Sequence, residues 1–84
     1  MRTLEERLQL AKQGKDLDNL VHDENYEVRM VVLEHERDED LDILVNDKNI
    51  FVRMEVVKVG RPEDLDVLIN DKEKAIRNLV RLYL

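Results

Sequence analysis

The pattern of apolar and polar residues that begins at Asp16 begins again at Asp40 and at Asp64. Residues 16–39 read DLDNLVHDENYEVRMVVLEHERDE, residues 40–63 read DLDILVNDKNIFVRMEVVKVGRPE, and residues 64–84 follow the same pattern over a shorter stretch. The first two units agree at 13 of 24 positions without a gap, and the second and third agree at 9 of 21. A fixed period of this length is typical of proteins whose units stack on their neighbours and bury a shared core.

Each unit predicts two helices. Its first half carries apolar residues at i, i+3 and i+4, which line one face of a short α- or 3₁₀-helix. These residues are Leu17, Leu20 and Val21, then Leu41, Leu44 and Val45, then Leu65, Leu68 and Ile69. The second half carries an i, i+4 pair that forms the inner face of a longer helix: Val28 and Val32, Val52 and Val56, Ile76 and Val80. Pro62 suits the first residue of a short helix, and Gly60 suits the residue just past a long one.

A recurring pair marks the turn between the two helices: His22-Asp23, Asn46-Asp47 and Asn70-Asp71. Asparagine tolerates the left-handed conformation that ends helices. Aspartate accepts backbone N–H groups and so starts the next helix. We therefore expect a tight turn at each pair.

The N-terminal segment resembles half a unit. Leu4 and Leu8 precede Val28 and Val32 by the length of one full unit, so residues 3–13 are expected to form a lone second helix. The chain then consists of an N-terminal capping helix in residues 1–15 and three repeats, 16–39, 40–63 and 64–84. Together they predict a single all-α domain over residues 1–84.

Composition narrows the functional classes. The 84 residues have a formal net charge of −6, which disfavours general attraction to nucleic acid or anionic membranes. The absence of cysteine excludes disulfides and thiolate metal sites. No apolar run approaches the roughly 20 residues that span a bilayer, and the start MRTLEERLQL lacks the apolar core of a signal peptide. We expect a cytoplasmic protein that does not enter membranes.

An aspartate and an arginine recur at a fixed spacing in every unit: Asp23 and Arg29, Asp47 and Arg53, Asp71 and Arg77. One interpretation makes the arginines a row of ligand-binding groups. A stacking role explains better why the two residues always recur together. We expect each aspartate to bond an arginine and turn N–H groups in a ladder along the stack, with Asp47 as the partner of Arg53.

No catalytic, cofactor-binding or metal-binding residue is predicted. Asp16 and Asp18 diverge on a helix, whereas a hard cation needs six or more converging oxygens. His22 and His35 do not recur, and no nucleophile stands at a fitting spacing from either. General acid–base catalysis needs a pocket, and a short stack of helices offers a groove. We therefore expect neither an enzyme nor a cofactor.

Basic residues gather in the C-terminal half and supply an alternative function, nucleic-acid binding. They are Lys48, Lys58, Arg61, Lys72, Lys74, Arg77 and Arg81. Interleaved acidic residues weaken this alternative, and the aromatic residues Tyr26, Phe51 and Tyr83 lack the pattern of a base-stacking platform.

The C-terminal end gains apolar residues where the end of a stack normally becomes polar. Leu79, Leu82, Tyr83 and Leu84 occupy positions that are polar or glycine in at least one earlier unit. In one interpretation these side chains fold back over the last core layer. In the other, two copies of the chain pair end to end across a two-fold axis.

The repeated unit Leu-x-x-Leu-(Val/Ile)-x-Asp-x-x-x-x-(Val/Ile)-Arg-x-x-Val, with its regular period, resembles the leucine-rich repeat variant family. That family has a repeat architecture similar to that of HEAT-like α-solenoids. The resemblance covers residues 16–84 and implies short 3₁₀-type helices alternating with α-helices in a right-handed superhelix. It also implies an inter-repeat ladder of aspartate and arginine. Founding members carry a cysteine-ligated iron–sulfur cluster, which a chain without cysteine does not share.

These patterns favour a non-catalytic helical-repeat scaffold that mediates protein–protein interaction. The expected partner is an unidentified protein or a second copy of the chain. The expected contact surface lies at varying positions of the second helices and at the apolar C-terminal end. The varying positions are Met30, Val31, Glu34, Met54 and Lys58.

Overall fold

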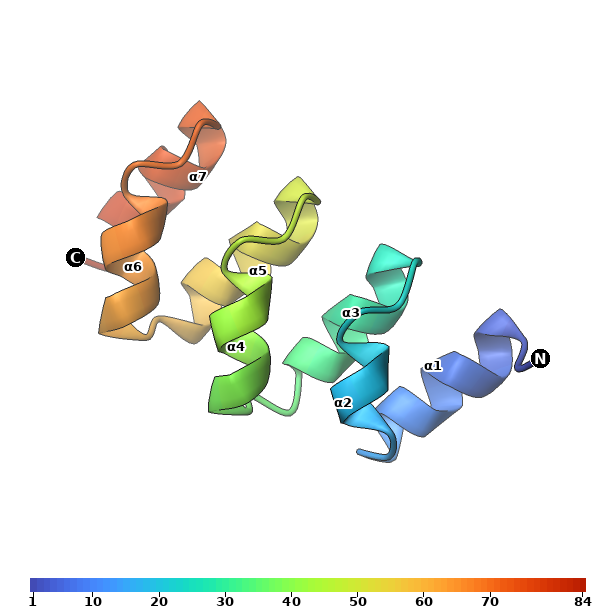
Figure 1. Ribbon diagram of the computed structural model, residues 1–84. Coiled ribbons are helices and arrows are strands. Elements are labelled where there is room, and N and C mark those ends of the chain that lie inside the picture. The colour runs from blue at the N-terminus through green and yellow to red at the C-terminus, as the bar shows by residue number, and fades with distance from the viewer.

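The computed structural model describes residues 1–84 and contains seven α-helices and no strand (Figure 1). The helices are α1 (Leu4–Lys12), α2 (Leu17–Leu20), α3 (Tyr26–Leu33), α4 (Asp38–Leu44), α5 (Ile50–Val59), α6 (Pro62–Leu68) and α7 (Lys74–Arg81). The predicted all-α class is confirmed. Each sequence unit contributes one short helix followed by one longer helix, except that α2 is reduced to a single turn.

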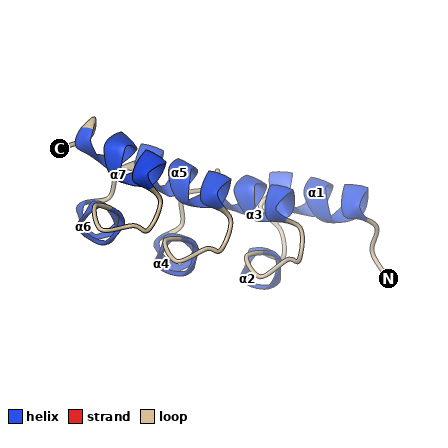
Figure 2. Ribbon diagram, turned by 90° about the horizontal axis from the view of Figure 1, so that it is seen from above, coloured by secondary structure: helices blue, strands red, loops and turns tan.

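The helices form two rows. Figure 2 shows α1, α3, α5 and α7 side by side in one row, with α2, α4 and α6 in a second row beneath them. Within the first row α1 contacts α3, α3 contacts α5, and α5 contacts α7. The molecule measures 40 × 20 × 16 Å along its principal axes, and its two termini lie at opposite ends (Figure 1).

The core lies between the two rows and consists of 17 buried apolar side chains. All six predicted inner residues of the longer helices have no exposed surface: Val28, Val32, Val52, Val56, Ile76 and Val80. Leu33 and Val57 are also buried, although the i, i+4 pattern did not single them out. Each fully buried side chain of this kind contributes about 1.5–3 kcal/mol relative to an exposed one. The repeated apolar positions are therefore explained by packing.

Helix ends follow several of the predicted signals. Pro62 is the first residue of α6, and Gly60 ends α5 in the left-handed conformation with φ of 81°. The predicted turns at Asn46 and Asn70 are present, and neither residue has a positive φ. The non-glycine residues with positive φ are Asp16 and Glu36. Both lie in the connection that leads from a longer helix to the next short one.

The register of α1 differs from the prediction. Ala11 is fully buried and Leu8 packs partly against the core, but Leu4 is 38% exposed. The reason is the connection after α1. Only three residue steps separate the left-handed Gly14 from Leu17, whereas five separate Gly60 from Leu65. The shorter connection shifts α1 by two residues along its axis relative to the later units.

Candidate functional site

The recurring arginines bond aspartates of the next unit. Arg29 Nε and Nη2 donate to the Asp47 carboxylate at 2.8 and 3.1 Å, and Arg53 does the same to Asp71 at 2.8 and 3.2 Å. Arg7 of α1 holds Asp23 in the same way, at 2.7 and 3.4 Å. These bidentate pairs are charge-assisted and directional. They tie each longer helix to the turn of the following unit.

The expected bond between Asp47 and Arg53 is corrected in its detail. The side chain of Asp47 bonds Arg29, while Arg53 Nη1 donates to the backbone carbonyl of Asp47 at 2.8 Å. Asp47 Oδ1 also accepts the backbone N–H of Asn49 at 2.8 Å, as the prediction of turn N–H groups requires. Within one unit the arginine therefore reaches the backbone of the aspartate, whose carboxylate faces the preceding unit.

A second row of arginine–aspartate bonds was not predicted. Arg37 and Arg61 occupy equivalent positions in consecutive units, each before a short helix, and each holds a buried aspartate in the first turn of that helix. Arg61 Nε and Nη2 donate to Asp64 at 2.8 and 2.9 Å, and Nη2 also donates to Asp42 of the preceding short helix, α4, at 2.8 Å. The recurrence of an arginine at this position in both units was the available signal.

Hydrogen bonding shifts the pKa of several groups in these networks. The hydrogen bonds that Arg37 donates to Asp40 and then to Asp18 raise the pKa of Arg37, and the bond that Arg61 donates to Asp64 raises the pKa of Arg61. Both guanidinium groups therefore stay charged at any physiological pH. The pKa of Asp16 is lowered, first by the hydrogen bond from Asn19 and then by that from Arg2. The hydrogen bonds therefore favour the charged forms of all three groups.

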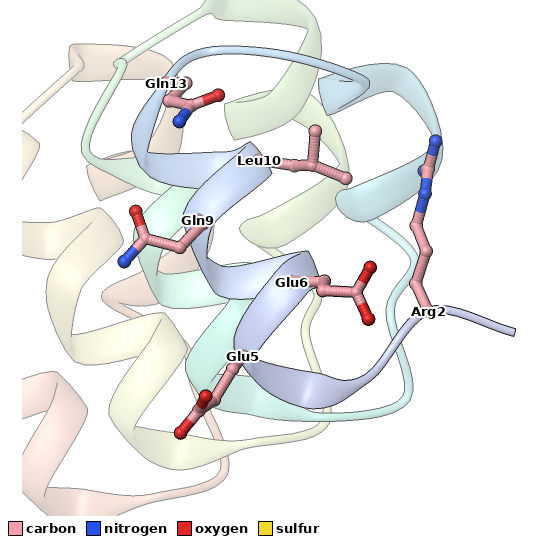
Figure 3. A pocket seen from close by; sticks show the side chains of 6 residues that line it. All are labelled: Arg2, Glu5, Glu6, Gln9, Leu10 and Gln13. Carbon is pink, nitrogen blue, oxygen red and sulfur yellow. The ribbon is translucent and has the colours of Figure 1, made fainter.

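The surface offers no enclosed catalytic cavity. An open concavity runs along α1 and is lined by Arg2, Glu5, Glu6, Gln9, Leu10 and Gln13. Figure 3 shows that these side chains point in different directions along the helix and do not converge on one point. No group of three or more histidine, cysteine, aspartate or glutamate side chains is placed to hold a metal ion.

The apolar C-terminal residues divide into two sets. Leu79 packs partly against the core, and the Tyr83 ring lies beside Gly60 while remaining 44% exposed. Leu82 and Leu84 are 79% and 76% exposed. The interpretation in which all four side chains fold back is therefore wrong for Leu82 and Leu84.

The basic residues of the C-terminal half do not form one strip. Arg61 is used in bonds to three aspartates, Asp38, Asp42 and Asp64, and Lys58 pairs with Glu55 at 3.1 Å. Lys48 and Lys72 lie on the turns between short and longer helices. Arg77 and Arg81 lie on α7.

A strip of exposed apolar side chains crosses α3 and α5. Tyr26 and Phe51 are 38% and 55% exposed, and their ring centroids are 6.2 Å apart. Met30, Val31 and Met54 pack against the core while remaining partly accessible. Val31 and Met30 also border a shallow groove between α1 and α3. We call Tyr26, Met30, Val31, Phe51 and Met54 the outer strip. Met30, Val31 and Met54 were predicted from the sequence as part of a contact surface. Tyr26 and Phe51 were not.

None of the seven helices is both long enough and apolar enough to cross a membrane. Comparisons with protein-family models, with curated proteins and with solved structures returned no match to the chain. The functional conclusion therefore depends on the geometry of the chain itself.

Proposed function

We propose that the chain is a non-catalytic helical-repeat scaffold that binds a protein partner through the outer strip. The observation that carries the proposal is the neighbouring pair of aromatic rings, Tyr26 and Phe51, on the surface of adjacent longer helices. Exposed aromatic and methionine side chains are enriched where proteins bind one another. The recurring side chains of Arg29, Asp47, Arg53 and Asp71, by contrast, are bonded within the chain.

The proposed architecture is a short right-handed α-solenoid of three 24-residue repeats with α1 as its N-terminal cap, similar to leucine-rich repeat variants. The contacts α1–α3, α3–α5 and α5–α7 support it, because each joins equivalent helices of consecutive units. The Arg29–Asp47 and Arg53–Asp71 bonds support it as well. Such stacks present an extended surface of neighbouring helices to other macromolecules.

Charge at the border of the outer strip defines the partner further. Glu27 on α3 and its C-cap Glu34 are exposed, Lys12 and Glu27 border the groove beside Met30, and Glu55 on α5 is paired with Lys58. The whole chain carries a net charge of −6. Complementary charge accelerates encounter and rejects partners of like charge. The partner surface is therefore expected to combine apolar side chains with flanking lysine or arginine, as an amphipathic basic helix does.

Site-specific photocrosslinking tests this proposal. A benzoyl-phenylalanine introduced at Phe51 places the reactive group in the outer strip, and one at Val67 provides the control. Val67 is 49% exposed and lies on α6 in the other row of helices. The proposal predicts that one protein is crosslinked repeatedly at position 51 in native cytosol and not at position 67.

Two results contradict the proposal. Equal crosslinking at both positions, or none at position 51, removes the outer strip as a binding surface. Nucleic acid crosslinked at either position in place of protein favours the alternative nucleic-acid-binding module. That module also predicts a mobility shift at low salt that weakens steeply as salt is raised.

A further inference from the structure

Arg77 is held like the ladder arginines but has no carboxylate partner. Its Nη1 donates to the Asp71 carbonyl at 2.6 Å, as Arg29 Nη1 donates to the Asp23 carbonyl at 2.6 Å. Arg29 and Arg53 then use Nε and Nη2 to hold a carboxylate. The corresponding atoms of Arg77 bond no such partner within the chain, and no buried polar atom is left without a hydrogen bond. The partly exposed Arg77 guanidinium is therefore held at Nη1, while its Nε and Nη2 have no carboxylate partner.

Arg81 adds a second positive charge on the same helix. It occupies the position that Leu33 and Val57 hold in the two earlier units, where both are buried against a neighbouring helix. Arg81 is exposed, and its Nη1 donates to the Asn78 amide oxygen at 2.9 Å. A position that is apolar between units is thus cationic on α7. The face of α7 that carries Arg77 and Arg81 suits a negatively charged partner better than another apolar helix face.

Leu82 and Leu84 follow Arg81 directly at the C-terminal end of α7 and are largely exposed. Paired copies related by a two-fold axis through α7 would bring together the Arg77 and Arg81 groups of both chains. Like charges placed opposite one another across an interface disfavour association strongly. An acidic segment with apolar residues, in contrast, satisfies the guanidinium groups and covers the leucines.

We infer that Arg77, Arg81, Leu82 and Leu84 form a docking site for an acidic segment of a partner protein, one in which an aspartate lies in the turn two residues before a helix N-cap. The three internal pairs supply the reason, because in each the bound carboxylate belongs to such a turn. Asp23, Asp47 and Asp71 all accept the backbone N–H two residues ahead while they bind an arginine. Arg77 presents the same fork to a carboxylate from outside the chain. This site is separate from the outer strip, and neither proposal depends on the other.

Nuclear magnetic resonance of the full chain tests the inference directly. The probe is a capped peptide of residues 22–35, HDENYEVRMVVLEH, which contains Asp23 and has a formal charge of −3 from four acidic residues and one arginine. The Nε–Hε signals of Arg29 and Arg53 serve as internal references for a carboxylate-bound guanidinium. Titration is expected to move the Arg77 Nε–Hε signal toward theirs, and a peptide with Asp23→Asn is expected to bind at least tenfold more weakly.

Variants locate the site. Arg77→Gln is expected to weaken peptide binding at least tenfold, and Arg81→Gln at least threefold. The control Lys72→Gln also removes one exposed positive charge, and its affinity for the peptide should stay within twofold of the wild-type value. Since the wild-type Arg77 signal is read in the unaltered protein, the test stands even if a variant unfolds. An unmoved Arg77 signal at saturating peptide, or equal binding of the Asp23→Asn peptide, overturns the inference. The inference is also overturned if the Arg77 signal shifts with protein concentration in the absence of peptide and sedimentation shows a dimer. The occupant of the site is then a second copy of the chain.

Discussion

Replacing Asp47 with alanine removes the carboxylate that joins the second and third longer helices. Arg29 and Asp47 have side chains only 7% exposed each, so little solvent screening applies. Arg29 would keep its bond to the Asp23 carbonyl but lose both bonds of its fork. Breaking a buried pair by removing one partner typically costs about 3–5 kcal/mol. The backbone N–H of Asn49 also loses its acceptor, and such a capping bond is worth about 1 kcal/mol.

Double-mutant cycles distinguish the pairing of Asp47 with Arg29, in the preceding unit, from the alternative pairing of Asp47 with Arg53 in its own unit. The cycle of Asp47→Ala with Arg29→Met is expected to give a coupling free energy of about 2–3 kcal/mol, because the two side chains bond directly. The cycle of Asp47→Ala with Arg53→Met is expected to give less than about 0.5 kcal/mol. Arg53 bonds only the backbone carbonyl of Asp47, which alanine retains.

Urea unfolding followed by circular dichroism at the helical band measures all the variants. A domain of this length is expected to have a free energy of unfolding of about 4–13 kcal/mol. The less stable double variants are best measured with a stabilising osmolyte present at equal concentration in every sample. Equal coupling in the two cycles, or a larger value with Arg53, would refute the proposed pairing of consecutive units.

The remaining predictions concern backbone strain, buried charge and acidity. Gly60 has φ of 81°, so Gly60→Ala is expected to lower the unfolding free energy by about 1 kcal/mol. Glu36 is not a glycine but has φ of 51°. Glu36→Gly is therefore expected to leave the unfolding free energy unchanged or raise it by up to about 1 kcal/mol. Urea unfolding checks both variants: the midpoint should fall for Gly60→Ala and stay the same or rise for Glu36→Gly. Arg61→Met leaves the Asp64 carboxylate, which is 2% exposed, without the guanidinium that holds it. The unfolding free energy is therefore expected to fall by about 3 kcal/mol, as urea unfolding at neutral pH would show. Backbone and side-chain bonds within the α1 capping box lower the pKa of Glu6 from 4.5, so its contribution is present above that pH and lost on acidification. Glu6→Gln should therefore lose less stability between pH 6 and pH 3 than the wild type does, and an identical loss would contradict this assignment.

The sequence pattern predicted the helices because apolar spacing and helix-end residues act locally. Val28 and Val32 share a helix face at any position in a fold, and Pro62 fits a first helical turn regardless of its neighbours. The register of α1 was predicted poorly. It depends on the length of the connection that follows Gly14, and a two-residue difference there escapes a pattern that assumes a strict period.

The polar networks were predicted only in part for a related reason. Recurrence of Asp47 and Arg53 indicated a ladder, but recurrence within every unit cannot distinguish a bond inside one unit from a bond between two. Only the placement of α3 beside α5 shows that the Asp47 carboxylate reaches Arg29. Phe51 was missed as a surface residue because its equivalents are Glu27 and Ala75, so no period identified it.

We propose that the recurring residues hold the fold while the outer strip binds a partner. Two measurements on Phe51→Ser test this together: its affinity for the protein captured by crosslinking, and its free energy of unfolding. We expect binding at least tenfold weaker, a loss of about 1.4 kcal/mol or more. The unfolding free energy should stay within about 0.5 kcal/mol of the wild type, because Phe51 is a half-exposed surface residue. Wild-type affinity in a normally folded Phe51→Ser protein would contradict the claim.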